Sequence, residues 1–218
     1  MKKRVKIFSL ALAALLILSG VGVAAQGQEY RVACIGDSLT YGTGADNIET
    51  DSWPAVLASL PGFLRLETLN FGVYGSTVSQ VEGKTYTDTT AYRDSLSCEA
   101  DVYLVMLGSN DTLFPFLAGD FVTGYRELLQ TYLDTGARVV VLLPPNMYYD
   151  GFFTFLDEDI YKVRAAERSV AEELGLEVID LSSLSEELED CCIDGGHFNS
   201  EGYAAFAEYI YRQLSHML

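Results

Sequence analysis

Short apolar runs that alternate with amphipathic patterns constrain the fold of this chain more than any other feature. Residues 102–107 and 139–143 are apolar at every position. Runs of this kind are typical of strands that are covered on both faces of a parallel sheet. These two runs with their flanking residues, together with three further runs, predict five strands. The predicted strands are residues 30–35, 64–71, 101–107, 137–143 and 176–181.

Apolar residues at helical spacing lie between and after these runs. One set comprises Phe121, Tyr125, Leu128, Leu129 and Tyr132, and another comprises Tyr203, Phe206, Ala207, Ile210 and Leu214. Gly136 and Gly175 follow helical patterns as C-terminal stop signals. Strands that alternate with helices favour a parallel sheet with helices on both faces. We expect a flavodoxin-like, three-layer α/β/α fold with about five strands, formed by residues 26–218 as one domain.

The first 25 residues have the pattern of a secretory signal peptide. Four basic residues among the first six precede the apolar run 7–23, and small residues end at Ala25. We expect cleavage after Ala25 and a secreted or extracytoplasmic protein. The alternative is an uncleaved membrane anchor, for which the run is short. Contact with a membrane is expected only in that case.

The charge of the chain limits its partners. The formal net charge is −17 and the pI is about 4.3. Such a surface repels phosphate backbones, so we expect no nucleic-acid partner. The four cysteines and two histidines lack the paired spacing of a structural zinc site, and no metal or organic cofactor is predicted. Four cysteines allow three pairings, which the sequence leaves open.

Four short motifs supply the groups that acyl transfer requires, namely a nucleophile, a base with its carboxylate, and oxyanion donors. The first three follow predicted strands directly, where sites in parallel α/β sheets lie. A single Gly-Asp-Ser is as often a plain turn as a site, but four motifs in one order are hard to explain as turns. They are Gly36-Asp37-Ser38-Leu39-Thr40, Gly72-Val73-Tyr74-Gly75-Ser76, Gly108-Ser109-Asn110-Asp111 and Asp194-Gly195-Gly196-His197.

On these motifs the chain resembles the GDSL lipase/esterase family, also called SGNH hydrolases, from about Tyr30 to the C-terminus. The resemblance implies that Ser38 is the nucleophile and that Asp194 and His197 complete a catalytic triad. It also implies an oxyanion hole formed by Ser38, Gly75 and Asn110. One departure is visible, because this chain has His197-Phe198-Asn199 where the family often has His-Pro-Asn.

The chemistry of the residues leads to the same roles. Serine needs a base to take its proton, and His197 is the histidine with a plausible site around it, since the other histidine is His216 near the chain end. Glycine at position 75 lets a backbone N–H approach the substrate without a β-carbon in the way. Asp37 and Asp111 are interpreted as structural hydrogen-bonding residues.

Three aromatic residues are candidates for substrate contact. Tyr74 and Tyr148 follow predicted strands near the expected site, and Phe198 is expected to shape the edge of its pocket. The neighbouring loops 112–119 and 144–155 lack the long amphipathic pattern of a lid. A shallow site of this kind is predicted to bury a short acyl group and leave a long chain in water.

The function predicted from the sequence is a secreted serine esterase that works through an acyl-enzyme. Its expected substrates are short-chain acyl esters, above all O-acetyl groups on carbohydrates, or related small molecules. Two alternatives stay open: action on longer acyl chains as a lysophospholipase or thioesterase, and transfer of acyl groups onto polysaccharide. A protein that binds ligands without catalysis is disfavoured, because binding alone does not require Ser38, Asn110, Asp194 and His197 together. The sequence leaves open the alcohol portion of the substrate and the oligomeric state.

Overall fold

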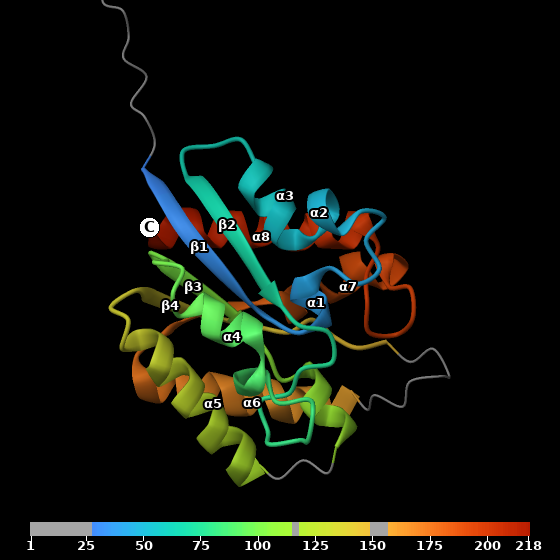
Figure 1. Cartoon of the computed structure of the whole chain (residues 1–218). Helices are drawn as coiled ribbons and strands as arrows, with labels where there is room; N and C mark the ends of the chain where they lie inside the picture. The colour runs from blue at the N-terminus through green and yellow to red at the C-terminus, as the bar shows by residue number, and fades with distance from the viewer. Residues whose placement is uncertain (1–27, 115–117, 149–156) are drawn as a thin grey trace, which may run out of the picture.

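A five-stranded parallel sheet forms the centre of the molecule (Figure 1). The computed structural model describes residues 28–114, 118–148 and 157–218. The strands lie in the order β2-β1-β3-β4-β5, and each neighbouring pair is parallel. They are β1 (Glu29–Gly36), β2 (Arg65–Gly72), β3 (Val102–Met106), β4 (Arg138–Leu143) and β5 (Glu177–Asp180). The predicted flavodoxin-like architecture is confirmed, and each strand end lies within one residue of its predicted position.

Helices cover both faces of the sheet, as the sequence pattern predicts. Figure 1 shows α3 and α8 on one side and α4, α5 and α6 on the other. The α-helices are α1 (Ser38–Tyr41), α2 (Ile48–Asp51), α3 (Trp53–Ser59), α4 (Thr90–Ser95), α5 (Ala118–Leu133), α6 (Asp157–Leu174), α7 (Ser185–Leu188) and α8 (Ser200–Met217). Short 3₁₀ helices lie at η1 (Tyr86–Asp88), η2 (Ser109–Leu113), η3 (Leu181–Leu184) and η4 (Glu189–Cys191).

The sheet separates two hydrophobic cores, because successive side chains of a strand point to opposite faces. In β1, Val32 and Cys34 pack into the core under α3 and α8. Their neighbours Ala33 and Ile35 pack into the core under α5 and α6. Side chains on both faces of β3 and β4 are buried in the same way, which explains why these two strands are apolar throughout.

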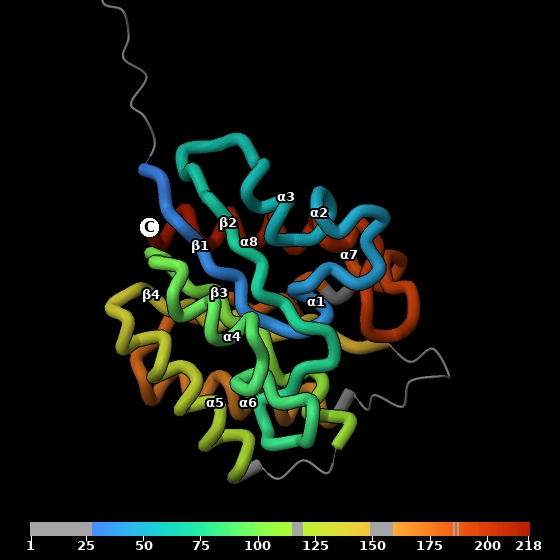
Figure 2. Tube along the Cα trace, in the orientation of Figure 1, coloured from blue at the N-terminus to red at the C-terminus, as the bar shows by residue number. Residues whose placement is uncertain are grey.

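The strand order places three of the four motifs together at the carboxyl ends of the strands. β1 lies between β2 and β3. The connection after β1 therefore leads to β2 on one side, and the connection after β2 crosses back past β1 to β3 on the other side. The segments after β1, β2 and β3 therefore emerge side by side at their carboxyl ends (Figure 2). This reversal is where parallel α/β sheets form their ligand sites.

The sequence leaves cysteine pairing open, and no disulfide bond joins the four cysteines within the described residues. Cys34 is buried within β1, in agreement with its apolar surroundings in the sequence. No helix in the described ranges is long and apolar enough to cross a membrane. The predicted signal peptide, its cleavage point after Ala25 and the alternative anchor lie outside the described residues.

Candidate active site

Ser38, His197 and Asp194 form one continuous chain of hydrogen bonds. Ser38 Oγ lies 2.8 Å from His197 Nε2, and His197 Nδ1 lies 2.7 Å from Asp194 Oδ2. Because an ionised carboxylate only accepts hydrogen bonds, Nδ1 carries the proton and Nε2 is left to accept from the serine hydroxyl. In this arrangement the imidazole can take the serine proton as the oxygen attacks a carbonyl carbon.

Asp194 also holds the turn that carries His197. Its Oδ1 accepts the backbone N–H groups of Gly196 at 3.1 Å and His197 at 2.8 Å. Burial raises the pKa of Asp194, but the hydrogen bonds from the His197 side chain, from its backbone and from Gly196 outweigh burial and leave the pKa lowered. The carboxyl group therefore stays ionised, which fixes the tautomer of the imidazole.

Ser38 begins α1 directly after β1, with Asp37 as the N-cap. Asp37 Oδ1 accepts the N–H of Leu39 at 2.9 Å, which fixes the first turn of the helix. The Asp37 side chain is fully buried, and burial raises its pKa from the ordinary 3.8 to about 6. Asp37 thus has the structural role that the sequence predicted for it.

The three residues predicted to form the oxyanion hole line one pocket. Ser38, Gly75 and Asn110 come from the segments that follow β1, β2 and β3. Gly75 has a φ of 73°, which a side chain would make unfavourable. The Asn110 side-chain amide donates to Ser76 O at 3.0 Å and to Asp37 Oδ2 at 3.3 Å. These bonds fix the orientation of the amide.

Asp111, the residue after Asn110, fixes the loop that carries Gly75. Its two carboxylate oxygens accept the backbone N–H groups of Val78 at 3.0 Å and Ser79 at 2.8 Å. The side chain is buried, and burial raises its pKa in spite of these bonds. Asp111 thus has the structural role expected from the sequence, and its contacts show that it holds the loop after β2.

Glu167 is a buried acid that lies outside the four sequence motifs. It lies on α6 with no exposed surface, and neither carboxyl oxygen has a hydrogen-bond partner within the described part of the chain. A β-carbon at Gly108 would lie 2.7 Å from Glu167 Oε1, so the carboxyl group packs against the backbone that leads to Asn110. Burial, with the charges of Asp111 and Asp37, raises its pKa well above the ordinary value.

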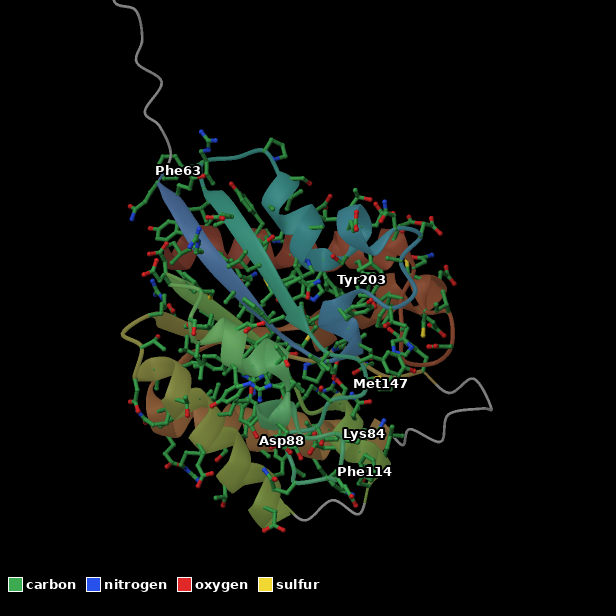
Figure 3. The ribbon with its side chains drawn as sticks, viewed as in Figure 1. Phe63, Lys84, Asp88, Phe114, Met147 and Tyr203 are labelled. Carbon is green, nitrogen blue, oxygen red and sulfur yellow. The ribbon has the colours of Figure 1, made fainter. Side chains whose placement is uncertain are left out.

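The pocket around these groups is small and partly apolar. Its volume is about 170 Å³, below the roughly 300–1,000 Å³ of pockets that enclose drug-sized ligands. Beyond the residues already described, its walls come from Leu39, Tyr74, Lys84, Ser109, Leu113, Phe114, Met147 and Gly196. Figure 3 shows Lys84, Phe114 and Met147 at the same end of the sheet.

The three aromatic candidates for substrate contact lie in different places. Tyr74 lines the pocket, is 62% exposed and stacks on His197 with ring centroids 6.0 Å apart. Tyr148 is half-buried, with its ring edge-on to Phe198, and the neighbouring Met147 lines the pocket instead. Its role stays a prediction.

The prediction that Phe198 shapes the edge of the pocket is wrong. Its side chain has no exposed surface and packs against Tyr203 and Phe206 of α8. Residue 198 forms an antiparallel bridge with Cys192, and along such an extended segment neighbouring side chains point in opposite directions. Since His197 faces the pocket, Phe198 faces the core.

Within the described ranges, no group of three or more histidine, cysteine, aspartate or glutamate side chains is placed to hold a metal ion. Parts of the loops 112–119 and 144–155, predicted to lack a lid, lie outside the described residues.

A comparison with protein families identifies the family of this chain. The model of the GDSL-like Lipase/Acylhydrolase family matches residues 34–205, most of the chain. An acetylxylan esterase from Xylanibacter ruminicola is 28% identical over 203 residues, which are 83% of this chain and 42% of that protein. The chain thus spans less than half the length of this curated relative.

Solved structures with the same fold include two esterases. An aryl esterase from M. smegmatis gives a TM-score of 0.72 at 20% identity, with 87% of this chain and 100% of that chain covered. A carbohydrate acetylesterase from Sinorhizobium meliloti gives a TM-score of 0.70 at 20% identity, with the same coverage. At these identities the similarity shows the fold alone.

Proposed function

The chain belongs to the GDSL-like lipase/acylhydrolase family of carboxylic ester hydrolases, and we propose that it removes short acyl groups, above all acetyl, from carbohydrates. The observation that carries this proposal is a hydrogen-bonded Ser38–His197–Asp194 chain that opens into a pocket of only about 170 Å³. A pocket of this size accommodates a short acyl group and offers little surface to a long one. The acetylxylan esterase relative supports the same substrate class.

In the proposed mechanism Ser38 Oγ attacks the ester carbonyl as His197 Nε2 takes its proton. The negative charge that develops on the carbonyl oxygen is stabilised by the backbone N–H groups of Ser38 and Gly75 and by the Asn110 amide. His197 then protonates the departing alcohol, which leaves an acyl group on Ser38. Water, activated by the same imidazole, hydrolyses this acyl-enzyme and restores the serine.

We also propose that residues 1–25 are a signal peptide and that residues 26–218 act outside the cytoplasm. The basic start, the apolar run and the small residues before Gln26 support this. Expression of the full chain with mass spectrometry of the mature N-terminus tests it. A secreted product that begins at Gln26 is expected, and retention of residues 1–25 in a membrane fraction would contradict the proposal.

The substrate proposal is tested with p-nitrophenyl esters from acetyl to palmitoyl, together with acetylated xylan. We expect acetyl to butyryl esters to have the highest kcat/KM, with a burst of nitrophenol equal to the enzyme concentration where deacylation is slow. Ser38→Ala should lower the rate by about 10³-fold or more while the protein stays folded. A burst from the folded Ser38→Ala variant would contradict the mechanism.

Two other outcomes would point to the alternatives. A steady rise in kcat/KM toward octanoyl and dodecanoyl esters would favour a lysophospholipase or thioesterase, because each buried methylene is worth about 0.8 kcal/mol. Acetyl transfer to a sugar acceptor in preference to water would favour an acyltransferase.

A further inference from the structure

Lys84 is a cation at the rim of the pocket that the proposed mechanism does not use. It lies on the loop between β2 and η1, and its exposed side chain forms part of the pocket wall (Figure 3). Its backbone is fixed, because its N–H donates to Val81 O and its carbonyl accepts the N–H of Thr77, both at 2.9 Å. The loop therefore holds Lys84 at a defined position beside the site.

The ammonium group lies over the loop that carries Gly75. A β-carbon built on Gly75 would be 3.2 Å from Lys84 Nζ. If the pocket holds the acyl group, as proposed, the alcohol portion of the ester lies at the rim, where Lys84 is exposed. A charged group on that portion is then within reach of a long, flexible lysine side chain.

The charge of the chain makes this lysine unusual. Acidic residues number 31 against 14 lysines and arginines. Among the lysines and arginines of the described ranges, all but Lys84 and Arg65 have a side-chain partner. Five of them form ion pairs with carboxylates: Arg31, Arg126, Arg138, Lys162 and Arg168. Lys84 forms no ion pair within the described residues, and Asp194, the carboxylate in the same pocket, is bonded to His197.

We propose that Lys84 binds an anionic substituent on the alcohol portion of the ester, so that the preferred substrates are O-acyl esters of acidic carbohydrates. The substituent is a carboxylate, as in a uronic acid, or a sulfate. The inference rests on the proposed esterase function and adds the charge of the substrate to it. The net charge of −17 repels such a substrate at long range, but salt at 0.1 M screens this repulsion beyond about 10 Å and leaves the short contact with Lys84 effective.

The test compares three acetylated methyl glycosides that differ in one substituent: glucoside, glucuronide and glucoside 6-sulfate. Acetate release gives kcat/KM for wild type, Lys84→Gln, Lys84→Glu and Lys84→Arg. We expect wild type to prefer the charged glycosides by about threefold to fivefold, the size of a solvent-exposed ion pair. Lys84→Gln should abolish the preference, Lys84→Glu should invert it, and Lys84→Arg should keep it.

Arg65→Gln is the matched control. Arg65 has no ion pair within the described residues and begins β2, at the opposite end of the strand from the pocket, so the variant removes the same charge far from the site. It should keep the wild-type preference. In wild type, 0.5 M salt should reduce the preference. Equal preference for carboxylate and sulfate would identify charge alone as the recognised feature, and preference for the glucuronide alone would identify the carboxylate.

Three results would overturn the role of Lys84: equal kcat/KM of wild type on all three glycosides, a preference that persists in Lys84→Gln, or a loss in Lys84→Gln by the same factor on neutral and charged glycosides. The last would mean that the ammonium stabilises the oxyanion and not the substituent. Failure of the proposed function gives a different result, because wild type would then release no acetate from any of the three.

Discussion

A single carboxylate, Asp194, both orients the proposed base, His197, and shapes the turn that carries it. Asp194→Asn keeps an oxygen for the backbone N–H groups of Gly196 and His197 but removes the charge that faces His197 Nδ1. The amide can donate to the imidazole and favour the wrong tautomer. We expect kcat on p-nitrophenyl acetate to fall by about 10²- to 10⁴-fold with little change in Tm. Asp194→Ala should in addition lower Tm, and an active Asp194→Asn would contradict this role.

Asn110 is the one proposed oxyanion donor that is a side chain. Asn110→Ala should lower kcat by about 10²- to 10³-fold and change KM less, because the charge it stabilises develops in the transition state. The variant also releases Ser76 O, so Tm should be measured beside the kinetics. A raised KM with an unchanged kcat would make Asn110 a substrate-binding residue instead.

The site residues differed in how far the sequence could predict them. The motifs brought Ser38, Gly75, Asn110 and His197 to attention, and all four line one pocket. Phe198 was misplaced because a motif gives spacing and not the face on which a side chain lies. Glu167 was missed because a charged residue on a helix is ordinarily solvated, although it shares the buried stripe of Ile160, Val163 and Val170, which is a signal that the sequence contained.

At the scale of elements, the loop 73–79 after β2 depends on Asp111. Asp111→Asn replaces one acceptor oxygen by an amide that faces the N–H of Val78 or Ser79. We expect faster hydrogen exchange at these two amides and a fall in kcat of about tenfold to a hundredfold, because Gly75 lies on the same loop. Asp88→Asn is the control, since Asp88 is an exposed acid at the end of the same connection. Unchanged exchange at Val78 and Ser79 would contradict the anchoring role.

The strands were predictable because each is a short apolar run with polar ends, and both faces of β3 and β4 are buried. Gly175, with a φ of 69°, directly follows α6 as its type suggests, and Gly136, with a φ of 86°, lies in the turn after α5, which ends at Leu133. The short elements α1, α2 and α7 were not predicted, because four residues give no helical period. Their bounds depend on local bonds such as the Asp37 cap.

Three buried acids behind the site make the stability of the whole molecule depend on pH. Asp37, Asp111 and Glu167 all have raised pKa values, with burial as the largest cause. An acid whose pKa is raised by folding binds protons more readily in the folded state than in the unfolded state. The free energy of unfolding therefore falls as the pH rises from the pKa of the unfolded state through the pKa of the folded state. Asp37, at about 6, accounts for roughly 1.4 kcal/mol between pH 5 and pH 8.

The molecule is therefore expected to be more stable at pH 5 than at pH 8. Asp37 alone corresponds to about 3–6 °C in Tm for a chain of this size, and Glu167 and the repulsion within a net charge of −17 act in the same direction. Asp194 has a lowered pKa, so its contribution to stability is lost only as the pH falls below about 4, toward the pKa of the folded state. Calorimetry of the mature chain from pH 4 to pH 8 measures the profile.

The Glu167→Gln variant distinguishes the contribution of the buried carboxyl group to the pH dependence of Tm from the contribution of the net charge. The amide has nearly the same shape but takes up no proton, so the decline in Tm from pH 5 to pH 8 should be smaller in this variant than in wild type. Glu172→Gln is the control, because it removes the same charge from an exposed position of α6. It should leave the decline close to that of wild type. If both variants flatten the profile equally, the pH dependence comes from the net charge and not from the buried acid, since only Glu167 is shielded from solvent.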